Sequence, residues 1–282
     1  FQIRRGPDGD GIFIDESSGL ALGHRRLSII DLSEAGKQPM QWQSTKGIGQ
    51  FVISFNGEIY NFLELKKDLE QKGYKFKTKT DTEVILALYD EYKEKSFEML
   101  RGMFAFALWD DKNQKLFLVK DRYGIKPLYY CADGEKLVFA STVRAIIERS
   151  VISVQKNIQA YIGFLLFGSV PLPMTTIKNV FAVPAGCYLE FDEIGNKKLV
   201  KYYNLLNAFQ NKLHYTNDRQ GNVINKIRGL LEKSIDLHLI SDASLGVFLS
   251  GGLDSSVIVA LATKAKSDKI KTLSIIFNEP EF

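Results

Sequence analysis

The sequence predicts a layered α+β domain followed by the start of a separate α/β domain. From Gly11 to about Tyr203 the apolar residues mostly alternate with polar ones, a pattern typical of strands that bury one face. Beyond Asn222 the apolar residues recur at three- and four-residue steps, which indicates a helix. A chain of 282 residues, 45% of them hydrophobic and 25% charged, is long enough for two modest globular domains.

Two helices interrupt the strands of the first domain. One is predicted at about residues 62–72. The other starts at Thr80, where Thr80 and Glu83 can form a capping box ahead of apolar residues at helical spacing. Turn-forming residues at 110–114 and 192–196 each join two strand-like runs. Sheets with helices on their faces make a layered α+β domain.

A polar stretch rich in Asn and Gln, residues 206–221, is interpreted as a linker. It divides the chain into a first domain, residues 1–205, and a second domain, residues 222–282. The sequence begins on Phe1 rather than Met and ends directly after a strand-like run. We therefore expect the chain to be part of a longer protein.

The second domain is predicted to contain a βαβ unit. A helix at 223–238 precedes a strand at 245–249, a loop rich in Gly and Ser, a helical run at 257–261 and a second strand at 272–277. Two strands joined through a helix are expected to pair in parallel. The sequence ends before such a sheet would be complete.

Composition and charge exclude several classes of protein. The net charge is +4 and the basic residues are scattered, so nucleic-acid binding has no support. Residues 74–79 alternate in a pattern typical of a solvent-exposed edge strand with lysines on one face. The longest apolar run, residues 160–170, is shorter than the ~20 residues of a membrane span. Cys131 and Cys187 lie among apolar residues, which predicts core positions in a reducing, cytoplasmic protein. The oligomeric state stays open, with a homodimer among the alternatives.

The strongest chemical motif follows the strand at 245–249. It consists of Ser250, Gly251, Gly252, Leu253, Asp254, Ser255 and Ser256. Two glycines allow close approach of an anion, and a helix start directs N–H groups and hydroxyls at it, so the motif predicts a phosphate cradle. The lysine of a Walker A loop is missing. Asp254 could hold Mg²⁺ against a polyphosphate. A serine-capped helix after a glycine turn is the structural alternative.

Three separated pieces of the first domain suggest a second site. Arg26 follows Gly23 and His24, and an arginine pairs well with a carboxylate. Asn56-Gly57 is most often a tight hairpin turn, but an Asn amide and a Gly N–H can also stabilise an oxyanion. Asp81 is, taken alone, more typical of a helix-start carboxylate than of a ligand-binding group.

The loop from Ser250 to Ser256 resembles the pyrophosphate loop of the N-type ATP pyrophosphatases, which activate carboxylates by adenylation. The resemblance implies ATP and Mg²⁺ at this loop. It also implies that the backbones near Phe248 and Ile276 contact adenine.

The N-terminal pieces together resemble class II glutamine amidotransferase domains, which are N-terminal nucleophile hydrolases. The motifs are Arg-Gly-Pro-Asp, Arg-Leu-Ser-Ile-Ile-Asp, Asn-Gly-Glu-Ile-Tyr-Asn, Asp-Thr-Glu and the Asp-Arg-Tyr-Gly-Ile-Lys-Pro-Leu-Tyr-Tyr of residues 121–130. Their order resembles that in the glutamine-hydrolysing asparagine synthetases over nearly the whole chain. The resemblance implies an αββα sandwich followed by a nucleotide-binding domain.

By this resemblance Arg26 binds the α-carboxylate of glutamine, Asp81 its α-amino group, and Asn56 with Gly57 forms the oxyanion hole. Residues 121–130 are interpreted as structural. The family's nucleophile is an N-terminal cysteine, which we expect before Phe1 because the two internal cysteines have no free α-amine. We therefore expect the 282-residue fragment alone to be inactive as a glutaminase.

The function implied is ATP-dependent synthesis of asparagine from aspartate through an aspartyl adenylate, with ammonia from glutamine hydrolysis. Two alternatives remain open. One is a related amidotransferase or a ring-closing enzyme, such as a β-lactam synthetase, that adenylates another carboxylate. The other is a non-catalytic sensor of glutamine or nucleotide. The sequence does not identify the acceptor carboxylate.

Overall fold

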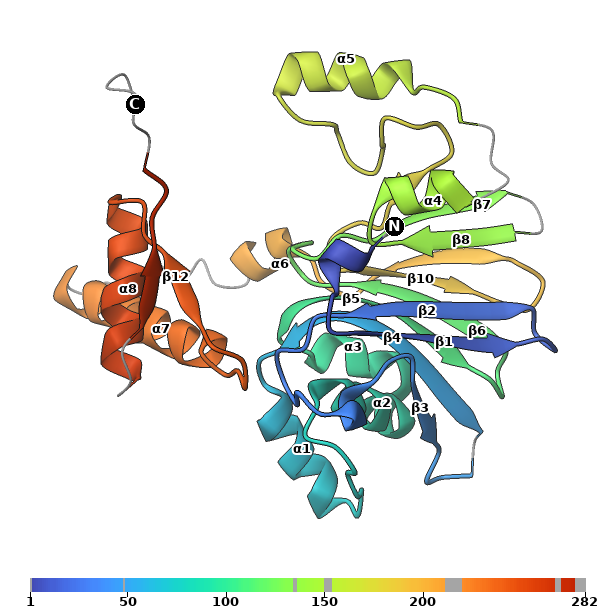
Figure 1. The fold of residues 1–282 in the computed structure, drawn as a ribbon, viewed down its shortest axis with the longest axis horizontal. Helices are drawn as coiled ribbons and strands as arrows, with labels where there is room; N and C mark the ends of the chain where they lie inside the picture. Colours follow the sequence, from blue (N-terminus) through green and yellow to red (C-terminus); the bar gives the residue numbers. More distant parts are fainter. Residues whose placement is uncertain are drawn as a thin grey trace. The chain divides into compact units, whose positions relative to one another are not determined.

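A six-stranded antiparallel sheet lies at the centre of the N-terminal unit in the computed structural model (Figure 1). In spatial order its strands are β11 (Lys197–Lys201), β10 (Cys187–Phe191), β6 (Lys115–Lys120), β5 (Gly102–Asp110), β4 (Gln50–Ile59) and β3 (Met40–Gln43). The chain forms two compact units, residues 1–210 and 211–282. The structure describes residues 2–47, 49–133, 136–149, 154–210, 220–266 and 270–276.

Two smaller sheets pack against one face of the large sheet. One is the hairpin of β1 (Gly9–Asp15) and β2 (Leu20–Arg26); the other has the order β8 (Lys136–Ala140), β7 (Tyr129–Asp133) and β9 (Phe181–Ala182). Buried apolar side chains fill the space between the layers, including Leu22 of β2, Val52 of β4, Leu118 of β6 and Tyr130 of β7. This core joins the sheets into a sandwich.

Helices cover both outer faces of the sandwich (Figure 1). They are α1 (Phe62–Gln71), α2 (Asp81–Tyr92) and α3 (Ser96–Met99) on the large sheet and α4 (Val143–Arg149) on the other side. The next helix, α5 (Ile158–Phe167), leaves large apolar side chains such as Leu165 and Phe167 exposed. The short 3₁₀ turns are η1 (Ile3–Arg5), η2 (Glu34–Gly36) and η3 (Lys93–Lys95). The ring of Tyr89 in α2 lies 5.1 Å from that of Phe51 in β4. On the opposite side Ile146 of α4 packs with Cys131 of β7. The order helix, sheet, sheet, helix confirms the predicted αββα class.

The local predictions for this unit are mostly confirmed. α1 occupies the predicted helix, and the turns at 110–114 and 192–196 join β5 to β6 and β10 to β11. The Thr80 hydroxyl accepts the Glu83 N–H at 3.2 Å, as in a capping box. The reciprocal half of the box is wrong. The Glu83 carboxylate instead accepts the backbone N–H groups of Lys77 and Thr78, because the preceding loop folds back over the helix start.

The predicted edge strand at residues 74–79 is also wrong, since this segment forms no strand. The side chains of this segment nevertheless alternate between more buried and exposed positions. Tyr74 and Phe76 each place a ring 6.3 Å from Trp42, whereas the intervening lysines are exposed. Packing of aromatic side chains on one side of an irregular loop produces the same period of two as a strand.

The second unit contains the predicted βαβ arrangement. Its elements are α7 (Gln220–His238), β12 (Gly246–Phe248), α8 (Leu253–Ala265) and β13 (Lys271–Leu273). β12 and β13 pair in parallel, with Val247 opposite Thr272. Lys264 of α8 forms an ion pair with Glu232 of α7 at 2.7 Å. Residue 277, the predicted end of the second strand, lies outside the described residues.

The segment interpreted as a linker begins with a short helix, α6 (Leu205–Gln210), and its residues 211–219 lie outside the described part of the chain. Among the helices that the structure describes, none combines the length and the apolar character needed to cross a membrane.

Asp121 is the main polar support of the loop after β6. It is fully buried, and its carboxylate accepts the backbone N–H groups of Phe104, Tyr123, Ile125 and Lys126 at 3.0–3.2 Å. We predict that Asp121→Ala lowers the free energy of unfolding by roughly 3–5 kcal/mol, because four backbone donors, in one buried and three partly buried hydrogen bonds, lose their acceptor. Urea denaturation followed by circular dichroism would measure the loss.

Asp68→Ala is the matched control, since Asp68 lies exposed on α1. Its free energy of unfolding should stay within about 0.5 kcal/mol of the wild-type value. Equal stability of the two variants would contradict the structural role of Asp121.

Candidate functional site

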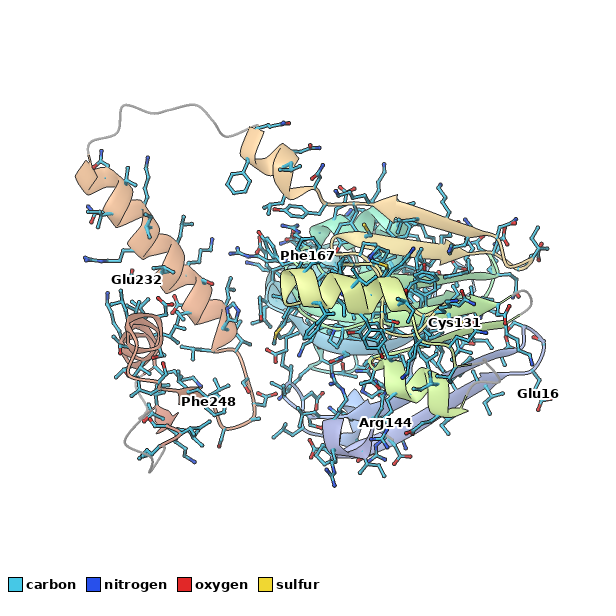
Figure 2. The ribbon with its side chains drawn as sticks, turned by 90° about the horizontal axis from the view of Figure 1, so that it is seen from above. Glu16, Cys131, Arg144, Phe167, Glu232 and Phe248 are labelled. Atoms are coloured by element: carbon cyan, nitrogen blue, oxygen red, sulfur yellow. The ribbon has the colours of Figure 1, made fainter. Side chains whose placement is uncertain are left out.

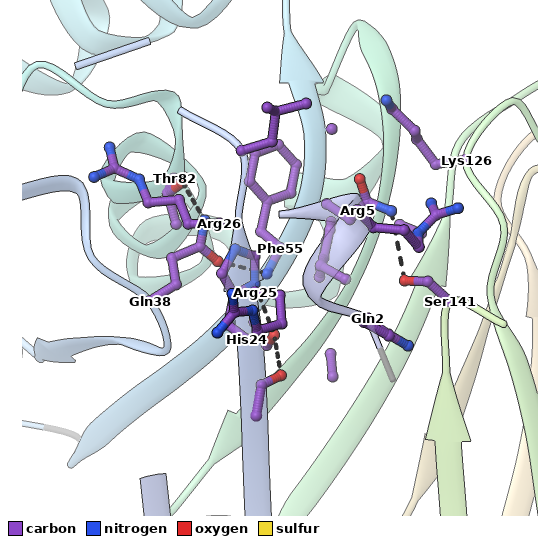
Figure 3. Close-up of a pocket in the computed structure, with 18 of the residues that line it drawn as sticks. Gln2, Arg5, His24, Arg25, Arg26, Gln38, Phe55, Thr82, Lys126 and Ser141 are labelled. Atoms are coloured by element: carbon purple, nitrogen blue, oxygen red, sulfur yellow. Dashed lines mark hydrogen bonds between the residues drawn. The ribbon is translucent and has the colours of Figure 1, made fainter. Parts of the chain in front are cut away.

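A pocket of about 580 Å³ lies in the N-terminal unit where the two layers of strands meet the start of α2 (Figure 3). Its lining includes all four residues that the sequence assigns to one site, namely Arg26, Asn56, Gly57 and Asp81. They come from β2, from β4 and from the first residue of α2. Residues up to 55 positions apart in the sequence therefore face one cavity.

Asn56 and Gly57 lie inside β4 and do not form the hairpin turn that was the structural alternative. They pair with Ala105 and Phe104 of β5. A Cβ atom at residue 57 would overlap the carbonyl oxygen of Met103, so only glycine permits this close approach of the two strands. The Asn56 side chain reaches the hydroxyl of Ser141 at 3.5 Å.

The N–H of Gly57 points away from β5. The residue opposite, Phe104, uses both of its backbone groups on the other side: its N–H donates to the Asp121 carboxylate, and its carbonyl accepts the Asp121 N–H at 2.8 Å. Opposite residues in an antiparallel pair alternate between bonded and non-bonded pairs. The pair of Gly57 and Phe104 is therefore non-bonded, and the Gly57 N–H is directed to the outer edge of β4.

Asp81 is both the helix-start carboxylate and a residue of the pocket. Its side chain is 4% exposed, and Oδ2 accepts the Ile59 N–H at 2.9 Å. Burial, and to a smaller extent the negative charge of Glu58, raises the pKa of Asp81 to about 7, although backbone N–H groups oppose the shift. With a pKa of about 7, the Asp81 carboxyl is only partly ionised at pH 7, and a cation that binds beside it would favour its charged form.

Arg26 ends β2 and holds the following loop. Its Nη1 donates to the carbonyl oxygen of Ser33 at 2.7 Å, and its Nη2 donates to the carbonyl oxygen of Asp31. A guanidinium has five N–H donors, so three remain for a ligand. Gly36 lies directly against the guanidinium, where a larger side chain would overlap it.

Several pocket residues were missed by the sequence analysis. Glu58 follows Asn56 by two positions, so the two side chains lie on the same face of β4. His24 lies 3.3 Å from the hydroxyl of Ser54, and burial with the nearby Arg26 lowers its pKa to about 4, so the ring is neutral at pH 7. The alternation of β4 could have indicated Glu58. Contacts between distant segments, such as that of His24, have no local signal.

The two cysteines take no part in this pocket. Cys131 and Cys187 are free and buried, and neither lines the cavity. Cys131 lies in the packed interior of the unit (Figure 2). Cys131 is 1% and Cys187 4% exposed, which confirms their interpretation as core residues, and this burial raises the pKa of both thiols.

The predicted phosphate loop lies between β12 and α8 of the second unit. Gly251 has φ +77° and open space around its Cα, and Gly252 is the N-cap of α8. The first N–H to bond within the helix is that of Ser256, which donates to the Gly252 carbonyl at 3.1 Å. The hydroxyls of Ser250 and Ser255 lie 3.1 Å apart across the loop. Backbone N–H groups at 253–255 therefore remain to bind an anion.

The residues at this loop fit a nucleotide with one divalent cation. Asp254 is exposed in the first turn of α8, and Mg²⁺ with phosphate ligands needs only one or two protein carboxylates. The described part of the chain contains no cluster of three or more His, Cys, Asp or Glu residues for a dedicated metal site. Phe248 ends β12 and Ile276 follows β13, both largely exposed.

Comparison with known proteins gives the family. A model of the glutamine amidotransferase domain matches residues 2–203, and a model of asparagine synthase matches residues 226–282. The glutamine-hydrolysing asparagine synthetase 1 of Bacillus subtilis is 38% identical over 282 residues, 99% of this chain and 42% of its own length. A putative asparagine synthetase of Methanocaldococcus jannaschii is 36% identical over 97% of this chain and 54% of its own length.

A glutamine phosphoribosylpyrophosphate amidotransferase of Bacillus subtilis matches in structure with a TM-score of 0.47 and 20% identity, over 90% of this chain and 51% of its own.

The chain belongs to the family of glutamine amidotransferase domains, because the model of this family matches most of the chain, residues 2–203. Its C-terminal part is similar to the asparagine synthases. The chain spans 42% and 54% of the length of the two curated relatives named above.

The raised pKa of Asp81 predicts a specific pH dependence of stability. Between pH 4 and 7 the carboxyl ionises in the unfolded chain but stays protonated in the folded one, so stability falls as pH rises through this window, by up to about 4 kcal/mol. Asp81→Asn removes this fall. Denaturation of both proteins between pH 4.5 and 8 would test it, and parallel profiles would contradict the assignment.

Proposed function

We propose that the whole protein hydrolyses glutamine in its N-terminal unit and uses the ammonia to amidate aspartate, which its C-terminal unit activates with ATP. The observation that carries this proposal is the single pocket lined by Arg26, Asn56, Gly57 and Asp81. The matched family models and the names of the relatives support it. The two buried free thiols fit a reducing compartment such as the cytoplasm.

The charges of the pocket suit a free amino acid. Arg26 would pair its unused N–H groups with an α-carboxylate. Asp81 and Glu58 would together attract an α-ammonium, whose positive charge would lower the pKa of Asp81 and fix it as a carboxylate. A ligand with both charges on one carbon is thereby held at its head, leaving the side chain to extend along β4.

The backbone of β4 would then stabilise the reacting group. The Nδ2 of Asn56 and the N–H of Gly57 would donate to the oxygen of the carboxamide as it gains negative charge. A cysteine thiolate, which we place outside these 282 residues, would attack the carbon and release ammonia, leaving a thioester. Water would hydrolyse this thioester to glutamate and restore the thiol.

The C-terminal unit would activate the acceptor. The N–H groups at the start of α8 and the hydroxyls of Ser250, Ser255 and Ser256 would hold the phosphates, and Asp254 would hold Mg²⁺ there. Attack of the aspartate side-chain carboxylate on the α phosphorus forms an aspartyl adenylate and releases pyrophosphate. Ammonia then attacks the carbonyl carbon and releases AMP. The backbones at Phe248 and Ile276 would contact adenine.

The acceptor is the least constrained part of this proposal. A protein named amidase chry2, from Gibberella zeae, is 32% identical over 92% of this chain, so similar sequences occur under other names. A related enzyme that adenylates another carboxylate is therefore the second candidate. A sensor without turnover is the third.

The products distinguish these candidates. We predict that the whole protein converts glutamine, aspartate and ATP into glutamate, asparagine, AMP and pyrophosphate, measured by chromatography of the reaction mixture. Formation of ADP would contradict adenylation. Adenylation without asparagine would favour another acceptor, and absence of ATP–pyrophosphate exchange would favour the sensor.

The two sites should be separable by mutation. Asp254→Ala should reduce ATP–pyrophosphate exchange at least 100-fold while glutamine hydrolysis stays within about threefold, because Asp254 belongs to the phosphate loop alone. Arg26→Ala should do the reverse, lowering kcat/KM for glutamine about 100-fold while synthesis with added ammonium salt is kept. Loss of both activities in either variant would contradict this division.

A further inference from the structure

The outer edge of β4 has a strand partner over only the first four of its ten residues. β3 pairs with β4 from Gln50 to Ile53 and then ends. The next N–H groups directed to this edge belong to Phe55, Gly57 and Ile59, because alternate residues of an antiparallel strand face the same neighbour. A buried N–H without an acceptor is costly, so the fold must supply acceptors or use these groups.

Two of the three N–H groups are capped by side chains. The Phe55 N–H donates to Oε1 of Gln38 at 2.7 Å, and the Ile59 N–H donates to Oδ2 of Asp81 at 2.9 Å. No acceptor for the Gly57 N–H, which lies between them, is present among the described residues. The two caps thus leave one donor on this edge, and all three residues, Gln38, Gly57 and Asp81, line the pocket.

Gln38 is itself held rigidly. Its side chain is buried, with 7% exposed, and its Nε2 donates to the hydroxyl of Thr82 at 3.3 Å. Thr82 follows Asp81 in the first turn of α2. Gln38 therefore ties the edge of β4 to the same helix start that supplies the second cap. Figure 3 shows its side chain between Phe55 and Thr82.

We propose that Gln38 is a positioning residue of the glutamine site, which keeps the β4 edge in the geometry that presents the Gly57 N–H to the oxyanion. The inference rests on the proposed function. Gln38 acts through the backbone: by accepting the Phe55 N–H it fixes the peptide plane between Ser54 and Phe55, two planes before the one that carries the Gly57 N–H. An edge that is free to twist would move the Gly57 N–H away from the carbonyl oxygen, and small displacements of such donors are expensive in rate.

A purely structural role would have different consequences. If the Gln38 amide only satisfied a backbone group, its replacement should change the stability of the protein and leave the rate of glutamine hydrolysis by the folded protein unchanged. If Gln38 is a positioning residue, its replacement should lower kcat for glutamine hydrolysis more than it changes KM, because the oxyanion forms only in the transition state. Synthesis from ammonium salt should be kept, since it bypasses this pocket.

The decisive experiment compares three variants of the whole protein. Gln38→Met keeps the size of the side chain but removes the acceptor, and it should lower kcat for glutamate release about 10- to 100-fold with KM within about twofold. Gln38→Glu keeps an oxygen at this position and should recover most of the loss. Gln41→Met makes the same change at an exposed site on β3 and should have no effect.

Amide hydrogen exchange, measured by NMR with ¹⁵N-labelled Phe, Gly and Ile, gives a second readout. In Gln38→Met the Phe55 amide should exchange at least tenfold faster than in the wild type, while the Ile59 amide keeps its rate. This readout follows the cap itself and does not depend on activity. Unchanged exchange at Phe55 would overturn the inference.

The kinetic outcomes separate the two proposals. A wild-type protein that hydrolyses glutamine, with a Gln38→Met variant of equal kcat, overturns the role of Gln38 alone. Equal losses in Gln38→Met and Gln38→Glu also overturn it, because the acceptor would then not matter. A wild-type protein that releases no glutamate overturns the proposed function and this inference with it.

Discussion

The candidate pocket depends on one constraint, which is that the pairing of β3 with β4 stops at Ile53, before β4 reaches the pocket. A strand that loses its partner must find other acceptors for its backbone, and here they are side chains from the loop before β3 and from the start of α2. The same two side chains fix the distance between the large sheet and α2. The close pairing of β4 with β5 at Gly57 then sets the direction of the remaining N–H.

Charge is distributed in the pocket according to burial. Asp81 is almost fully buried and has a strongly raised pKa, whereas Arg26 is only half-buried and bonded to two loop carbonyls. An arginine stays charged in any such setting, but a buried carboxyl needs a cation to become ionised at low cost. The lining of the pocket thus includes Arg26, which is always positive, and Asp81, which becomes negative when a cation binds beside it, and this combination favours a ligand that carries its own cationic group.

The sequence could predict the layers and most elements because these depend on local patterns. The alternation of β4 and β5 and the Thr80 cap are examples. The candidate roles of Arg26, Asn56, Gly57 and Asp81 came from resemblance and stay predictions, although the fold brings the four residues to one cavity. Taken alone, the Asn56-Gly57 dipeptide favoured a hairpin turn, whereas it lies inside β4. Gln38 had no local signal, since its partners Phe55 and Thr82 lie 17 and 44 residues away.

The two candidate sites differ in how far the sequence can define them. The phosphate loop is built from seven consecutive residues whose conformation follows from glycine, serine and a helix start, so its geometry is largely local. The pocket draws on β2, β4, α2 and the loop before β3, which only the whole sandwich holds together. A substitution distant in sequence, such as one at Gln38, can therefore change the pocket through the backbone alone, whereas the loop should respond mainly to changes within itself.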